Sequence, residues 1–213
     1  MRIRLQHLMA LLAFAGGLVM AALPAQAHPH VWITAASELV YAPDGSITGV
    51  RHAWTFDDMF TTYALQGIET KTKGVYTREQ LAPLAKDNVE NLKEFAYFTF
   101  AKADGKKEKF QEPIDYFLDY KDEALTLHFT LPLKTPLKSK ELAVEVFDPA
   151  FFIDFKFADK DPVKLVGAPE TCQLKVQRPG EADVKKLTEE MIASGDQSKY
   201  GAIYANKIAV TCP

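Results

Sequence analysis

The stretch VWITAASELVYAPDGSITGVRHAWTFDD, residues 31–58, predicts a β-hairpin. Two runs with apolar residues at alternate positions flank the segment APDGS, residues 42–46. The dipeptide Asp44-Gly45 within it is among the strongest short signals for a hairpin turn. We therefore expect two antiparallel strands joined by a loop in which Asp44 and Gly45 are the two central residues.

This loop fixes which residues face each other across the hairpin. Glu38 faces Arg51, a pairing that allows a cross-strand ion pair, and Ile33 faces Phe56. Because side chains alternate between the two faces of a strand, the hairpin has one apolar face and one polar face. The apolar face carries Val31, Ile33, Ala35, Leu39, Val50, Trp54 and Phe56, and the polar face carries His30, Trp32, Thr34, Glu38, Arg51 and Asp57.

The segment 59–92 changes to helical spacing and forms a helical insertion between strands. It predicts one helix over 59–68 and a second over 77–92, where Thr77 followed by Gln80 resembles a capping box. The pair has the outline of an EF-hand, with Gly74 at the sixth loop position and Tyr76 at the eighth.

The calcium ligands of an EF-hand are missing from this segment. The first, third, fifth and twelfth loop positions hold Glu69, Lys71, Lys73 and Gln80. Two ammonium groups would repel a calcium ion, so we expect no calcium here. The segment is either a relic of an EF-hand or an ordinary helical hairpin.

Period-two patterns return after the helices and predict further strands. They lie in FAYFTF (95–100), IDYFLDY (114–120), ALTLHFTLPL (124–133), ELAVEVF (141–147), FFIDFKFA (151–158), CQLKVQ (172–177) and NKIAVTC (206–212). An amphipathic helix is expected over 181–193. Many antiparallel strands with inserted helices predict an α+β protein with sandwich-like sheets.

The first 27 residues have the features of a secretory signal peptide. Arg2 and Arg4 precede an apolar run over 8–23, and the small-residue pattern Ala25-Gln26-Ala27 follows. The alternative is a membrane anchor, but the run is short for the ~20 residues that a span needs. We expect cleavage after Ala27, an exported, periplasmic protein, and a single mature domain over 28–213 that begins with His28.

Charge and cysteine content narrow the function classes. Removal of Arg2 and Arg4 leaves 23 basic and 28 acidic residues, a net charge of −5. This balance argues against nucleic acid and anionic membrane surfaces as partners. The two cysteines, Cys172 and Cys212, are expected to form one disulfide in an exported chain. The alternative, a thiolate metal or redox pair, lacks the usual close spacing.

The sequence His28-Pro29-His30 could bind a transition metal at a mature amino terminus. His28 would offer its amine and its ring, and His30 lies two residues on, on the same side of an extended chain. Pro29 has no N–H, which excludes a square-planar site that uses that amide nitrogen. Amine and imidazole nitrogens suit zinc, nickel, cobalt or copper. The alternative is a frayed terminus whose histidines bind nothing.

Carboxylates could complete such a site. Asp57 is diagonal to His30 on the polar face, Asp58 lies next to it on the opposite side, and Asp148 ends a strand before a proline. An aspartate in that position is usually a turn residue, although it can also be a ligand.

The other two histidines of the mature chain are weaker candidates. His52 falls on the apolar face and is expected to be a hydrogen-bonded core residue. His128 lies between threonines on a polar face and is expected to be solvated. We find no catalytic triad, phosphate loop or HExxH motif, and we therefore predict that the protein is not an enzyme.

Six blocks follow one another along the sequence: HPHVW, RHAWTFDDMF, LAPLAKDNVENL, FTLPL, VFDPAFF and GAPETC. Taken in this order, they resemble domain of unknown function family 1007. The resemblance covers essentially the whole mature chain. It implies the periplasmic component of an uncharacterised transport system, associated with nickel/cobalt-type permeases and zinc uptake. The matching positions are His28, His30, Trp54, Asp57, Asp148 and Pro149. The segment ETKTKG departs from the acidic, Asp/Asn/Gly-rich segment of many members, which puts a calcium role in doubt.

Three functions remain open. The first is a periplasmic accessory protein that binds zinc, nickel or cobalt at His28 and His30, with Asp57 and Asp148, and passes the ion to an inner-membrane metal permease or ABC-type transporter. The second is a metal-free module that contacts such a transporter. The third is a copper oxidase with a histidine brace, which needs a second histidine, His52 or His128, beside His28.

Overall fold

Two β-sheets form the body of the protein, and the computed structural model describes residues 29–213 except 73 and 195–199. The six-stranded sheet has the order β5-β6-β2-β1-β8, with β9 also paired to β1. Its strands are β1 (Val31–Tyr41), β2 (Ile47–Phe56), β5 (Ile114–Lys121), β6 (Ala124–Leu137), β8 (Ile153–Phe157) and β9 (Val163–Val166).

The second sheet has five strands in the order β10-β11-β7-β3-β4. Its strands are β3 (Thr99–Ala103), β4 (Lys106–Glu108), β7 (Glu141–Val146), β10 (Gln173–Gln177) and β11 (Asn206–Thr211). The α-helices are α2 (Asp58–Ala64), α3 (Arg78–Leu92) and α4 (Glu181–Ser194), and the 3-10 helices are η1 (Lys93–Phe98) and η2 (Gly201–Tyr204). The mixed α+β class with two sheets agrees with the prediction.

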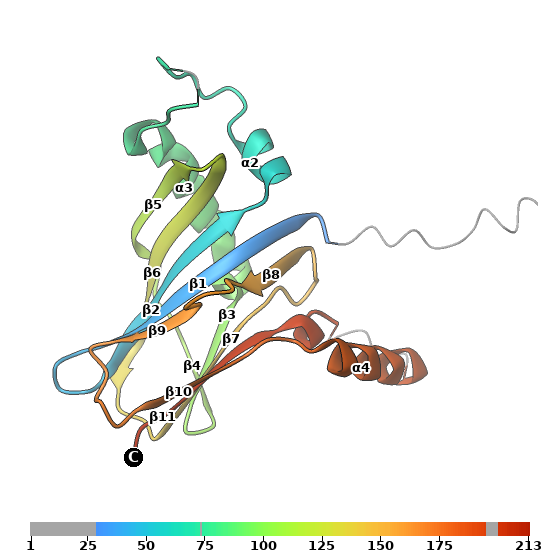
Figure 1. The fold of residues 1–213 in the computed structure, drawn as a ribbon. Coiled ribbons are helices and arrows are strands. Elements are labelled where there is room, and N and C mark those ends of the chain that lie inside the picture. Colours follow the sequence, from blue (N-terminus) through green and yellow to red (C-terminus); the bar gives the residue numbers. More distant parts are fainter. Residues whose placement is uncertain (1–28, 73, 195–199) are drawn as a thin grey trace, which may run out of the picture.

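The three α-helices take different places relative to the sheets (Figure 1). The helix α2 lies at one end of the six-stranded sheet, α3 packs against β5 and runs behind that sheet, and α4 extends away from the five-stranded sheet. None of the helices in the described part of the chain is long and apolar enough to span a membrane.

The predicted hairpin register is confirmed between β1 and β2. Ile33 pairs with Phe56 and Glu38 with Arg51, and the Arg51 guanidinium donates to the Glu38 carboxylate at 2.5 Å. The predicted apolar face is buried throughout, and its residues belong to a core that both sheets share. The alternation of apolar side chains therefore sets the inner face of the central hairpin.

The loop of the hairpin is one residue longer than predicted. The Ala42 N–H donates to the Ser46 carbonyl at 2.8 Å, and the Gly45 N–H donates to the Ala42 carbonyl at 2.9 Å. Gly45 has φ +80°, so a type I turn is followed by one left-handed residue, the usual three-residue hairpin loop. A register shift between Val40 and Tyr41 absorbs the extra residue and keeps the pairing beyond it unchanged.

The antiparallel arrangement that was predicted does not hold at one edge of β1. The strand β8 pairs in parallel with residues 31–35 of β1, and β9 pairs in parallel with residues 37–40. The two short strands follow each other along the same edge, separated by the loop around Pro162, whose carbonyl accepts from the Ser37 N–H at 2.8 Å. Period-two patterns carry no information on strand direction, and the short β9 gave no signal.

The helical insertion follows the prediction at its second helix. Thr77 caps α3 in a capping box, in which its hydroxyl accepts from the Gln80 N–H and the Gln80 side chain accepts from the Thr77 N–H. The first helix is shorter than predicted and ends at Ala64. The Gln80 side chain also donates to the Glu69 carbonyl at 2.9 Å.

The predicted strand over 95–100 is wrong for its first four residues. They belong to η1, and Ala96, Tyr97 and Phe98 have φ values of +52°, +53° and +47°. Left-handed conformations cost about 1–2 kcal/mol for each residue with a Cβ atom, so tertiary contacts must stabilise this turn. Tyr97 and Phe98 are buried, and the Thr99 hydroxyl donates to the Tyr97 carbonyl at 2.8 Å. We call residues 95–98 the left-handed turn.

The predicted disulfide between Cys172 and Cys212 is confirmed. Cys172 precedes β10 and Cys212 follows β11, so the bond joins the two ends of an antiparallel strand pair at the sheet edge. It closes a loop of 40 residues, for which the chain-entropy estimate is ~4 kcal/mol of stabilisation.

The strain in the left-handed turn gives a first prediction. Ala96→Gly should raise the free energy of unfolding by about 1 kcal/mol, because glycine adopts positive φ without a Cβ clash and Ala96 is exposed. Denaturant unfolding measures the change. Ala82→Gly, at an exposed position within α3, is the control and should lower it by about 1 kcal/mol. Equal losses in both variants would contradict a left-handed Ala96.

Candidate functional site

Asp57 joins the end of β2 to the start of β1. Its backbone N–H donates to the Trp32 carbonyl at 3.0 Å, and its carboxylate accepts from the Trp32 N–H at 2.7 Å. The same carboxylate caps α2 by accepting from the Phe60 N–H at 2.7 Å. A carboxylate has about four lone-pair sites, so these two bonds leave capacity for another partner.

Asp148 organises the turn between β7 and β8. It is 4% exposed, and its carboxylate accepts from the backbone N–H groups of Ala150, Phe152 and Ile153 at 2.8, 2.9 and 3.0 Å. Three N–H donors satisfy the carboxylate oxygens at this buried position and fix the side chain in the turn. The turn role that the sequence allowed for Asp148 is therefore present.

His30 is the described part of the predicted His-Pro-His metal site. It is exposed, its N–H donates to the Phe152 carbonyl at 2.9 Å, and its ring lies 4.7 Å from the Phe152 ring. Since Phe152 also donates its N–H to Asp148, His30 and Asp148 are linked through one residue. His28 lies outside the described residues.

The structure brings the three described ligand candidates, His30, Asp57 and Asp148, to one corner of the molecule at the start of β1, but not to one face. By the alternation of β1, His30 shares the outer face with Trp32 and its neighbour Asp57. Asp148 instead lines a cavity on the inner side, together with Val31. Within the described residues, no three His, Cys, Asp or Glu side chains come together as a metal-binding group. Asp58 is exposed in the first turn of α2.

His52 is a core residue, as predicted. It is 1% exposed; its Nδ1 lies 2.9 Å from the Ser37 hydroxyl and its Nε2 lies 3.2 Å from the Thr99 hydroxyl. Because Thr99 donates its one hydroxyl proton to a backbone carbonyl, it accepts from Nε2–H, and Ser37 donates to Nδ1. Burial holds the ring neutral and lowers its pKa from 6.5 to about 3. The histidine thus ties the two sheets together by hydrogen bonds.

The serine next to His52 does not form a catalytic pair with it. Ser37 is 3% exposed, so neither side chain is open to a substrate, and the second ring nitrogen faces a hydroxyl instead of a carboxylate. This contact joins β1 to β2.

His128 belongs to a stack on the outer face of the six-stranded sheet. Its ring is stacked on the Phe117 ring with centroids 4.5 Å apart, and the Arg78 guanidinium carbon lies over the Phe117 ring, 3.7 Å from its centroid. Asp119 accepts two hydrogen bonds from Arg78 and lies 3.6 Å from the His128 ring. Partial burial lowers the His128 pKa, while Asp119 opposes this shift. The stack anchors α3 to β5.

A cavity of about 590 Å³ lies between β1, β2 and α3, and sequence reasoning did not find it. Aromatic rings form much of its wall, and Asp148 and Asp87 are its charged lining residues. We call it the aromatic cavity. The available signal was the number of aromatic residues in RHAWTFDDMF and VFDPAFF, which the sequence analysis assigned only to the core and to strand ends.

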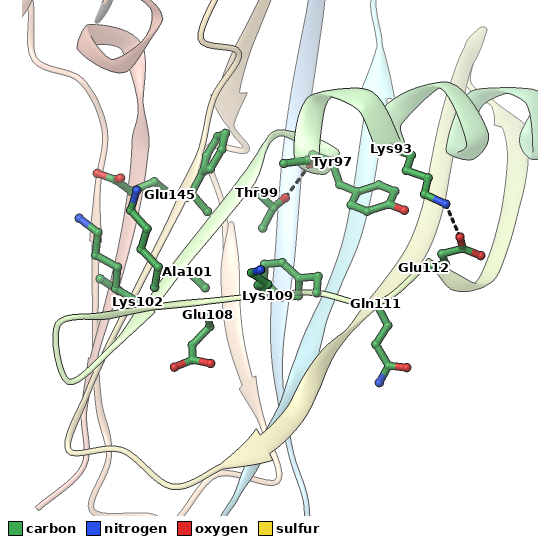
Figure 2. Close-up of a pocket in the computed structure, with 15 residues that line it drawn as sticks. Lys93, Tyr97, Thr99, Ala101, Lys102, Glu108, Lys109, Gln111, Glu112 and Glu145 are labelled. Atoms are coloured by element: carbon green, nitrogen blue, oxygen red, sulfur yellow. Dashed lines mark hydrogen bonds and ion pairs between the residues drawn. The ribbon is translucent and has the colours of Figure 1, made fainter.

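A second cavity, of about 570 Å³, lies on the other side of the left-handed turn, against β3 and β4 (Figure 2). It is lined by Lys93, Lys102, Lys107 and Lys109 and by three glutamates, and we call it the lysine-lined cavity. Lys93 donates to Glu112 at 2.5 Å at its rim. Phe95 and Phe98 of the turn line the aromatic cavity, while Ala96 and Tyr97 line the lysine-lined cavity.

Comparison with known proteins identifies the family. The family model described as "Protein of unknown function (DUF1007)" matches residues 12–212. The chain belongs to this family. The resemblance inferred from the six sequence blocks is thereby confirmed, and the family description states no activity.

The relatives of this DUF1007 chain are themselves uncharacterised. An uncharacterized protein of Haemophilus influenzae is 24% identical over 196 residues, which cover 87% of this chain and 91% of that protein. An uncharacterized 15.5 kDa protein of Spirochaeta aurantia, in the trpE 3' region, is 33% identical over 93 residues, 43% of this chain and 66% of that one. Acetylcholine-binding protein type 1 of Biomphalaria glabrata is 10% identical, with 88% of each chain covered and a TM-score of 0.38, which does not establish a shared fold.

The neutral, buried His52 predicts an acid-sensitive fold. The unfolded chain takes up a proton below pH 6.5 that the native state refuses until about pH 3. The free energy of unfolding is therefore fully retained above pH 6.5 and falls as the pH drops from there toward 3. Between pH 7 and pH 4 the His52 contribution to this loss should be about 3 kcal/mol.

Denaturant unfolding of His52→Gln at both pH values isolates this contribution. The glutamine amide keeps a donor and an acceptor for Ser37 and Thr99 but cannot titrate, so the variant should lose about 3 kcal/mol less than the parent. His128→Gln, on the partly exposed stack, should lose almost as much as the parent. Equal losses in the parent and His52→Gln would show that His52 is not held neutral.

Proposed function

We propose that this DUF1007 protein is a periplasmic accessory protein that binds zinc, nickel or cobalt at its mature amino terminus and delivers the ion to an inner-membrane metal permease or ABC-type transporter. The ligands are the amine and ring of His28 and the ring of His30, with carboxylate oxygen from Asp57 or Asp148. The proposed role is transport of the ion and not catalysis.

One observation carries this proposal: His30 and Asp57, far apart in sequence, share the outer face at the start of β1. Asp57 is held by backbone bonds to Trp32 and Phe60 and still has unused lone pairs. A fixed carboxylate near an exposed imidazole costs little ordering entropy when an ion binds. The two His28 nitrogens would raise the set to the four donors that zinc requires.

Asp148 supports the site from behind the strand. It accepts from the Phe152 N–H, and the Phe152 carbonyl accepts from the His30 N–H. We assign Asp148 as a supporting residue or an additional ligand, since its three hydrogen bonds leave about one lone-pair site. The donor set of nitrogen with carboxylate oxygen also accepts copper.

A metal-free interaction module is the second candidate function, and exposed side chains near this corner favour it. Trp32, Met59 and Phe152 are 40%, 60% and 47% exposed. Exposed aromatic residues and methionine are enriched in protein interfaces. A transporter that docks on this surface would contact the His30 corner whether or not an ion is bound.

A copper histidine brace has less support. His52 lies on β2 opposite Ser37, seven residues along β1 from His30, which corresponds to ~23 Å at the strand rise. His52 is also committed to two buried hydrogen bonds. His128 faces Ala53, which pairs with Ala36, so it is ~20 Å along the sheet from His30.

For the helical insertion we propose an EF-hand-like origin without calcium binding. Gln80, at the last ligand position, is used in the capping box and in a bond to the Glu69 carbonyl. We propose that the segment now serves to position α3 against β5.

The metal site can be tested with the exported, untagged protein. Native mass spectrometry with zinc, nickel or cobalt should show one ion per chain, and His28→Ala/His30→Ala should abolish it, because both imidazole donors are lost and only the terminal amine nitrogen remains. His128→Ala removes one imidazole far from the site and should leave uptake unchanged. Uptake that survives the double substitution would eliminate the site.

The carboxylates give a graded test of the same site. Asp57→Asn removes the negative charge, so metal affinity should fall about tenfold. Its single amide oxygen can accept from Phe60 or from Trp32 but not from both, so the free energy of unfolding should also fall by about 1 kcal/mol. Isothermal titration measures both this variant and Asp148→Asn. If Asp57→Asn has no effect and Asp148→Asn weakens binding tenfold, the inner carboxylate is the ligand.

The expected cleavage of the signal peptide gives a separate prediction about the first residue of the exported chain. The intact mass of the protein secreted with its own leader should correspond to a chain that starts at His28, because the Ala25-Gln26-Ala27 pattern fits signal peptidase. A different first residue would remove the amine ligand and, with it, the proposed site.

A further inference from the structure

We propose that the aromatic cavity is a binding site for a small organic ammonium cation with an apolar body. Its volume, about 590 Å³, lies within the ~300–1,000 Å³ of small-molecule sites in proteins. The cavity lies on the inner side of β1, so the inference requires neither His28 nor His30, and Asp148 is the residue that both proposals use.

The wall of the cavity suits an apolar body. Six aromatic side chains line it: Trp54, Phe56, Phe60, Phe95, Phe98 and Phe152. Phe95 and Phe152 are 51% and 47% exposed, so apolar surface remains open to solvent at the mouth, whereas Trp54 is 1% exposed. Burial of such surface by a ligand is favourable at ~25 cal/mol per Å².

The charge of the lining selects the polar end of the ligand. Its charged residues are Asp148 and Asp87, and the described residues that line it include no lysine, arginine or histidine. Aromatic faces attract a cation through their quadrupole, and the attraction grows when the cation is desolvated. A carboxylate ligand would meet two like charges and no cation, so the lining favours an ammonium group over an acid.

The lysine-lined cavity provides the contrast within the same molecule. It has a similar volume, but four lysines and three glutamates surround it. The two cavities share only the left-handed turn, which sends Phe95 and Phe98 into one and Ala96 and Tyr97 into the other. Basic residues are therefore present nearby in the same molecule, and the described lining of the aromatic cavity differs from that of its neighbour in lacking them.

The strain of the turn is consistent with a built site. Ala96, Tyr97 and Phe98 hold positive φ without glycine, and this conformation separates their side chains between the two cavities. An extended strand over the same residues would direct Phe95 and Tyr97 to one side and Ala96 and Phe98 to the other. The left-handed turn is what places Phe95 and Phe98 together, with rings 5.2 Å apart.

A series of ligands that differ only in charge tests the proposal. Octylammonium, octanol and octanoate are titrated below micellar concentration into metal-free protein that carries Trp32→Phe, so that Trp54 is the remaining tryptophan and reports from the cavity wall. We expect saturable changes in Trp54 emission and one calorimetric site for octylammonium, with affinity about tenfold higher than for octanol. Octanoate should bind more weakly still.

Two substitutions on α3 test whether the negative charge inside the cavity, and not the net charge of the helix, favours octylammonium. Asp87→Asn and Glu90→Gln each remove one negative charge from the exposed side of α3, but only Asp87 lines the aromatic cavity. Asp87→Asn should weaken octylammonium binding about threefold and leave octanol unchanged, while Glu90→Gln should change neither. Phe95→Ala, at the exposed mouth, should weaken binding of both ligands.

Different results would contradict the charge selectivity and the site itself. Equal affinity for all three ligands, or equal effects of Asp87→Asn and Glu90→Gln, would overturn the proposed charge selectivity. No binding of any ligand, with unchanged near-ultraviolet circular dichroism, would overturn the site itself. His28→Ala/His30→Ala should retain octylammonium binding, so that failure of the metal proposal and failure of this one are distinguishable.

Discussion

The pairing of β1 with its neighbours is the constraint on which the rest of the structure depends. On one edge β1 pairs with β2 in a register fixed by the alternation of apolar residues, and on the other it pairs in parallel with β8 and then β9. A shift of one residue would turn the whole apolar set toward solvent. The same register brings Asp57 to Trp32 and Ser37 to His52, so both the exposed corner and the polar contact in the core follow from it.

The sequence was sufficient to predict structure that depends on neighbouring residues, but it did not predict structure that depends on contacts between distant segments. The hairpin register, the Thr77 capping box and the Cys172–Cys212 bond rest on short patterns or on chemistry with one available partner. The parallel pairing of β8 and the left-handed turn depend on contacts with distant residues, which no short pattern encodes. For the candidate site, the sequence placed Asp57 on the same face as His30, but it could not show that Asp148 faces inward.

The left-handed turn connects the end of α3 to the two cavities. A strand over residues 95–100 would have satisfied the period-two pattern, but burial of Tyr97 and Phe98 and the Thr99 bond to the Tyr97 carbonyl stabilise the strained alternative. Thr99 also accepts from His52, so the turn is linked by hydrogen bonds to the central strands. The conformation of the cavity walls is therefore coupled to the core and not to a flexible loop.

Asp148 lies where the two proposed sites approach each other. Its three backbone hydrogen bonds fix the turn that leads into β8, and β8 pairs with the start of β1. The Asp148 side chain also lines the aromatic cavity. Three N–H donors hold its carboxylate oxygens in place, so their position is fixed before any ligand binds. In the two proposals the same side chain supports the metal site from behind β1 and lies beside the aromatic rings that would hold an organic ammonium group. The two proposed sites are therefore separate in their ligands but share one rigid turn.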